Sequence, residues 1–120
     1  MSLADTNLVI AVIRERDALK ERAETWLRRN PVPTVPYSVG LELLLIAKKR
    51  GFTRVGILGA ACRRLRMERL DVLLAAAEML DTGEVSGTFD AVHLAEAMHA
   101  ETTLVTADEA LWKMGNVKQF

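Results

Sequence analysis

Four acidic residues stand where a carboxylate is available for chemistry: Asp5, Glu42, Asp90 and Asp108. Asp5 belongs to a polar triplet set into the apolar run LADTNLVIAVI. An acid at a helix start ordinarily caps free N–H groups and meets the positive end of the helix dipole, and that role suffices for Asp90 or Asp108 taken alone. Glu42 follows Ser38 by four residues, which misses the three-residue spacing of a capping box, and it stands among leucines.

Together these acids suit a metal site. Converging carboxylates without His or Cys are the ligands that Mg²⁺ and Mn²⁺ prefer, and a divalent ion removes the repulsion among them. Such a site can orient water for in-line attack on a phosphodiester and hold charge on the leaving oxygen. These residue types therefore indicate a metal-dependent hydrolase, provided that the fold brings them together.

Alternating short strands and helices are expected to position these acids. Helical spacing predicts helices over about 19–29, 38–50, 53–63, 72–80 and 89–100, with a short one after Asp108. Extended segments are expected just before Asp5 and at 31–36, 67–71, 102–105 and 117–120, and Asp71 is expected to end a strand and cap the next helix. This order, without hairpin signals, favours an α/β fold with a parallel sheet covered by helices on both faces. Ligands bind such sheets at the carboxyl ends of the strands, and we expect Asp5, Glu42, Asp90 and Asp108 to line one acidic pocket at that edge. Glu42 is expected about one turn into the helix that follows the segment 31–36.

The charge distribution supports a polyanionic substrate. The formal net charge is zero, but eight Lys or Arg lie between residues 48 and 69 (48, 49, 50, 54, 63, 64, 66 and 69), and none lies between 70 and 112, where nine acids stand. A basic track beside an acidic site suits an enzyme that acts on nucleic acid, although two solvated faces of opposite sign are an equal alternative. The single cysteine excludes an internal disulfide, and the apolar N-terminal run is too short for a membrane span, so we expect a cytoplasmic protein.

Four stretches in order, ADTNLVIAVI, TVPYSVGLELL, TFDAVHLAEA and TTLVTADEAL, resemble the PIN domain, most closely the VapC-type toxin nucleases of toxin–antitoxin pairs. The resemblance implies one PIN-like domain over residues 1–120 with about five parallel strands, and it maps the family's acids onto Asp5, Glu42, Asp90 and Asp108. It further implies Mg²⁺ or Mn²⁺ as cofactor, endoribonuclease activity, a small antitoxin partner and a two-fold homodimer. Thr6 and Thr106 are adjacent to two of the acids and are expected to orient them.

Two alternatives remain open. A receiver domain of two-component signalling could use Asp71 as phosphoacceptor together with Thr106 and Lys118, but it leaves Glu42 and Asp90 without a role. A PIN-like domain could also bind partners without cutting RNA.

Further expectations concern association and substrate. The apolar helix around Leu73–Leu80 is expected to mediate self-association, unless it is buried within the domain. Asn7 is expected to cap a helix and Trp26 to lie in the core. Without an aromatic platform, a structured or looped RNA is expected as substrate.

Overall fold

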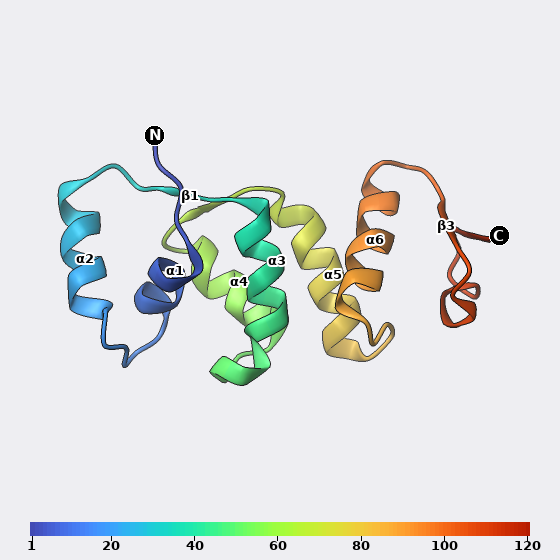
Figure 1. Cartoon of the computed structure of the whole chain (residues 1–120), viewed down its shortest axis with the longest axis horizontal. Coiled ribbons are helices and arrows are strands. Elements are labelled where there is room, and N and C mark those ends of the chain that lie inside the picture. Colours follow the sequence, from blue (N-terminus) through green and yellow to red (C-terminus); the bar gives the residue numbers. More distant parts are fainter. The chain divides into compact units, whose positions relative to one another are not determined.

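A computed structural model describes all 120 residues, and the chain divides into two compact units, Met1–Leu70 and Asp71–Phe120. The elements of the first unit are α1 (Thr6–Ile13), α2 (Lys20–Arg29), β1 (Thr34–Val35), α3 (Tyr37–Ile46), the 3-10 turn η1 (Lys48–Arg50), α4 (Arg54–Cys62) and β2 (Arg66–Met67). Those of the second are α5 (Leu70–Thr82), which begins at the last residue of the first unit, α6 (Thr88–His99), β3 (Leu104–Thr106), the 3-10 turn η2 (Glu109–Leu111) and β4 (Val117–Gln119) (Figure 1).

The α/β class is confirmed, and every strand pairing is parallel. β1 pairs with β2 and β3 pairs with β4, while Leu3 alone bridges to Thr34. The described strands thus number four in two small sheets, fewer than the about five expected. Their shortness has a local cause in β1, because prolines 31, 33 and 36 bracket it and cannot donate ladder hydrogen bonds. The single-domain organisation over residues 1–120 stays a prediction.

Helix α1 lies at the centre of the first unit. Its sequence is rich in β-branched residues, which favour strands on propensity alone, but residues 9–12 are all buried and packing outweighs that preference. The fully buried side chains around it include Leu43 and Leu44 of α3 and Ile57 and Leu58 of α4. Because Asp5 immediately precedes α1 as its N-cap, the core fixes the position of this candidate ligand.

The end of β2 differs from the expectation. The strand stops at Met67, and Arg69 adopts a left-handed backbone with φ of 52°, which ends the extended segment before α5 begins. Asp71 therefore lies inside the first turn of α5, where its Oδ1 accepts a hydrogen bond from the Val72 N–H at 2.9 Å. The prediction that Asp71 ends a strand is wrong, and a receiver-type phosphoacceptor at a strand end loses its basis.

The second unit holds a helical pair followed by the β3–β4 strands. α5 and α6 run in opposite directions, since His99 at the end of α6 lies 3.7 Å from the Asp71 carboxylate at the start of α5. Most apolar side chains of α5 are buried, including Leu73, Ala76, Ala77 and Leu80. The sequence left two possibilities for this helix, self-association or burial within the domain, and the structure shows the helix largely buried. A membrane-spanning helix needs about 20 predominantly apolar residues, and none of the helices described meets this requirement.

Candidate active site

Asp5 is the N-cap of α1. Its Oδ1 accepts a hydrogen bond from the Leu8 N–H at 3.0 Å, the i+3 geometry typical of a capping acid. The expectation that Asn7 caps this helix is wrong, because the Asp5 carboxylate already fills that place. The other Asp5 oxygen takes part in no capping bond and is available to a cation. Thr6, expected to orient Asp5, is the first residue of α1 and is half-buried.

Glu42 lies in the middle of α3 with an exposed side chain, between the buried Gly40 and the buried Leu43. It is therefore on the solvent side of a helix whose other side packs into the core. No hydrogen bond or ion pair engages its carboxylate, so it has no structural partner that would explain it. Both oxygens remain free to act as ligands.

Asp90 lies in the first turn of α6, and its carboxylate folds back over the N-cap residue Gly87. A Cβ atom on Gly87 would be 2.8 Å from Asp90 Oδ2 and 3.3 Å from Cγ. Only a residue without a side chain leaves the carboxylate in this place. The sequence alone indicates no more than a loop at Gly87, and its three-residue spacing from Asp90 is the one signal that could have revealed this role.

Asp108 is the N-cap of η2, and its Oδ1 accepts from the Ala110 N–H at 3.0 Å. The Thr106 hydroxyl accepts from the Asp108 N–H at 3.1 Å, and the Trp112 indole N–H donates to the Thr106 carbonyl at 3.1 Å. Thr106 thus fixes the backbone from which the Asp108 side chain projects, which supports a positioning role.

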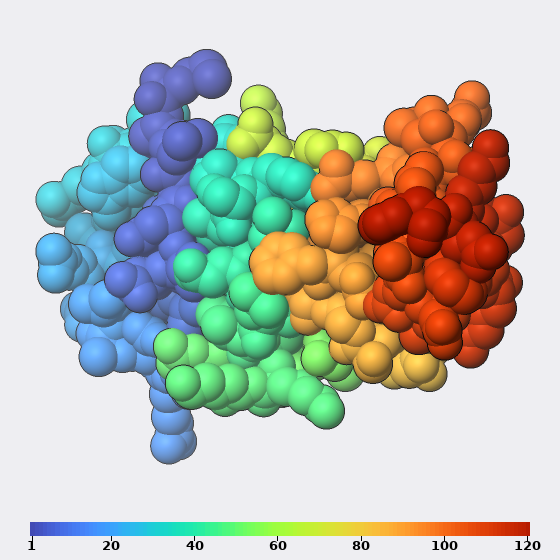
Figure 2. Space-filling model, turned by 45° about the vertical axis from the view of Figure 1, so that its right-hand side comes forward, coloured from blue at the N-terminus to red at the C-terminus, as the bar shows by residue number.

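A pocket of about 380 Å³ opens beside Asp5 in the first unit. Its lining includes Leu8 of α1, Arg22 and Trp26 of α2, and Pro33. In the space-filling view, the dark blue surface of the N-terminal segment and α1 lies beside the lighter blue surface of α2 (Figure 2).

Trp26 is 40% exposed, so the expectation that it lies in the core is wrong. The physical reason is that α2 is a surface helix in which Ala23 alone is buried, and Trp26 lies at the margin of that narrow buried stripe. The sequence analysis also did not predict that Arg22 lines this pocket. Its i, i+4 spacing from Trp26 was the signal that the two share a helix face.

Two of the four acids belong to each unit, and the donor chemistry of the set fits Mg²⁺ or Mn²⁺. All four are carboxylates, and each keeps at least one oxygen that makes no protein hydrogen bond. Within neither unit do three or more His, Cys, Asp or Glu side chains gather as a metal site. The set of four therefore stays a prediction.

The chain is similar to known proteins in two of three comparisons. The family model of the PIN domain matches residues 3–116. Among solved structures, a toxin–antitoxin complex from Klebsiella pneumoniae is similar to this chain, with 19% sequence identity and a TM-score of 0.40 over 98% of this chain and 96% of that chain. The search of curated proteins found no match.

Proposed function

The chain belongs to the PIN domain family, and from this premise we propose that it is a metal-dependent endoribonuclease, the toxin of a type II toxin–antitoxin pair. PIN domains are in general nucleases, and in general they use divalent metal ions. The single observation that carries the proposal is the match of the PIN domain model to residues 3–116. This stretch contains Asp5, Glu42, Asp90 and Asp108, which we propose as the metal ligands, and each keeps an uncommitted carboxylate oxygen.

Mg²⁺ or Mn²⁺ held by these four carboxylates would polarise the scissile phosphate and stabilise charge on the leaving oxygen. The chain itself supplies the ligands and their orientation. Helix caps hold Asp5 and Asp108, and Gly87 leaves room for the carboxylate of Asp90. Thr106 anchors the backbone N–H of Asp108.

The test is cleavage of cellular RNA with and without Mg²⁺. Asp5→Asn should abolish cutting while the protein stays folded, because asparagine caps a helix about as well as aspartate. Asp108→Asn should also abolish it. Glu109→Gln is the matched control, since this exposed acid is the next residue and lies in the same 3-10 turn. Cutting by Asp5→Asn at the wild-type rate would overturn the proposal.

The partners in this proposal are an RNA substrate, a small antitoxin and a second copy of the chain. The antitoxin is tested by co-expression with the product of the adjacent reading frame, which should suppress the cleavage. Since α5 buries most of its apolar side chains, a dimer needs other surface, and Phe89 and Met98 of α6 are about half-exposed. Sedimentation at micromolar concentration should give a dimer, and a monomer would contradict that part.

A further inference from the structure

The pocket beside Asp5 combines an aromatic face, a cation and a candidate catalytic acid. Trp26 lines this pocket and is 40% exposed, so part of the residue is open to a ligand. Leu8 and Pro33 line the same pocket and give it an apolar interior. Asp5 is part of the lining as well, so a group held in the pocket is adjacent to the N-cap of α1.

Arg22 adds a partner for negative charge. It precedes Trp26 by four residues on α2, which places the two side chains one turn apart on one face of the helix. A nucleotide presents the complementary pair of groups, since its base stacks on an aromatic ring and its phosphate accepts from a guanidinium. The volume of about 380 Å³ is that of a small-molecule site, which suits one nucleotide better than a whole helix of a partner protein.

We propose that this pocket is a nucleobase subsite, in which Trp26 stacks on one unpaired base of the RNA and Arg22 binds a neighbouring phosphate. The proposal rests on the proposed function, because Asp5 places the subsite next to the phosphodiester that is cut. It also replaces the expectation of a structured substrate. That expectation depended on the absence of an aromatic platform, whereas the exposed Trp26 favours a single-stranded segment.

The experiment observes Trp26 directly, in a Trp112→Phe background where it is the only tryptophan. A single-stranded oligonucleotide and an abasic oligonucleotide of equal length are titrated in EDTA, so that no cleavage occurs. The base-containing strand should quench Trp26 fluorescence, and the abasic strand should not. This readout needs no change at Trp26 itself.

Two variants distinguish the contribution of base binding from that of phosphate binding. Trp26→Ala should weaken binding of the base-containing strand about fivefold or more and leave the abasic strand unchanged. Arg22→Gln should weaken both strands equally and reduce the log–log salt slope by about 0.7, as expected when one phosphate of a single strand is no longer bound. Trp26→Phe keeps an aromatic face and should recover most of the affinity.

Absence of quenching, or equal affinity for both strands, would overturn the subsite. Quenching by an apolar peptide but not by the oligonucleotide would also overturn it and identify the pocket as a protein docking groove. If cleavage in Mg²⁺ remains sensitive to Asp5→Asn while Trp26 is not quenched, the subsite alone is wrong. If Trp26 is quenched in the Trp112→Phe protein but the chain with Trp112 intact cuts no RNA in Mg²⁺, the nuclease proposal fails instead.

Discussion

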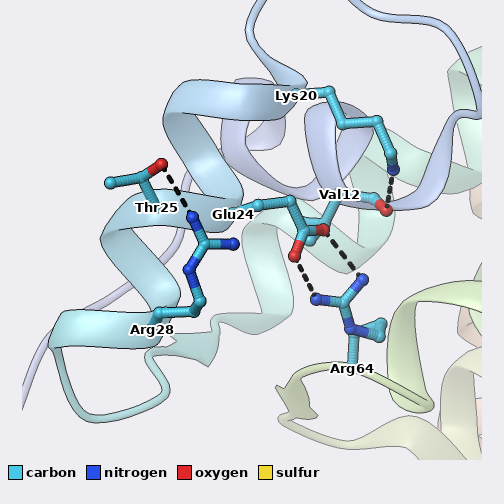
Figure 3. Close-up of polar contacts among 6 residues, drawn as sticks. All are labelled: Val12, Lys20, Glu24, Thr25, Arg28 and Arg64. Carbon is cyan, nitrogen blue, oxygen red and sulfur yellow. Dashed lines mark hydrogen bonds and ion pairs between the residues drawn. The ribbon is translucent and has the colours of Figure 1, made fainter.

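The Glu24 carboxylate on α2 and the Arg64 guanidinium after α4 form a two-pronged ion pair, with Arg64 Nη1 and Nη2 at 2.9 and 2.7 Å from the two carboxylate oxygens (Figure 3). The hydrogen bonds from Arg64 lower the pKa of Glu24 below its ordinary value of 4.5, and those to Glu24 raise the pKa of Arg64. The pair ties the surface helix α2 to the rest of the first unit. Arg64 is thereby engaged within the protein, so the basic track available to RNA is smaller than the sequence indicated.

This pair predicts an acid-dependent contribution to stability. Because the folded-state pKa of Glu24 is depressed, the contribution is complete above pH 4.5 and is lost as the pH falls through the lower folded value. Glu24→Gln should lower the free energy of unfolding at pH 7 by less than about 1 kcal/mol, since the pair is partly exposed. Chemical denaturation at pH 7 and pH 3 measures the change. The difference between the variant and wild type should be smaller at pH 3 than at pH 7, and the exposed Glu21→Gln on the same helix should show no such narrowing.

Gly87→Ala tests the placement of Asp90. The added methyl group would occupy the space 2.8 Å from Asp90 Oδ2, so the carboxylate must rotate away. The backbone itself tolerates alanine, because φ at Gly87 is −85°. We expect weaker Mg²⁺ binding and slower RNA cleavage at an unchanged unfolding midpoint of the metal-free protein.

Gly59→Ala is the control for that change. Gly59 lies within α4, and a Cβ atom there would meet nothing within 4 Å. Alanine should stabilise this helix by about 0.5–1 kcal/mol and leave metal binding and cleavage unchanged. Equal loss of cleavage in the two variants would show that Gly87 has no specific link to Asp90.

Metal binding should be visible in stability as well as in activity. Mg²⁺ or Mn²⁺ at a hundredfold excess over the dissociation constant should raise the free energy of unfolding by about 2.7 kcal/mol if it binds the folded chain alone. Asp5→Asn and Asp90→Asn should each lose most of this response, which thermal unfolding with and without the ion measures. An undiminished response in both variants would exclude these acids as ligands.

The sequence predicted most elements because their signals are local. Asn30 before Pro31 ends α2 where expected, and Gly51, with φ of 84°, follows η1 as a helix stop. The end of β2 was not foreseeable in this way. It depends on a left-handed backbone at Arg69, a conformation that arginine has no intrinsic tendency to adopt.

The candidate site was predictable to a different extent. Acids at helix starts are visible as sequence patterns, and Asp5 and Asp108 are indeed N-caps. The exposure of Trp26 was not visible, because apolar spacing on a helix shows which side chains share a face but not how wide the buried stripe is. The fit of Gly87 against Asp90 depends on a rotamer, which no local pattern encodes.

The last prediction concerns how the protein binds those parts of the RNA that lie away from the phosphodiester that is cut. Residues 1–70 contain fourteen Lys or Arg and seven acids, whereas residues 71–120 contain two and nine, so the two units carry net charges of +7 and −7. The exposed Lys48 and Lys49 belong to η1, and the next residue, Arg50, shares a pocket with Arg14 and Arg16 just past the C-terminal end of α1.

Asp5 caps the other end of α1, which is about 12 Å long at 1.5 Å per residue. The basic cluster, formed by Arg14, Arg16 and residues 48–50, can therefore bind backbone phosphates that are distant from the phosphodiester that is cut. Replacing Lys48 and Lys49 by Gln should weaken RNA binding and reduce the log–log salt slope by about 0.7 for each phosphate that is no longer bound. The cleavage rate at saturating RNA should not change, since neither lysine lines the pocket beside Asp5. Lys113→Gln with Lys118→Gln makes the same charge change in the acidic unit and should leave binding nearly unaltered. Equal weakening by the two double variants would mean that net charge, and not the basic cluster, attracts the RNA.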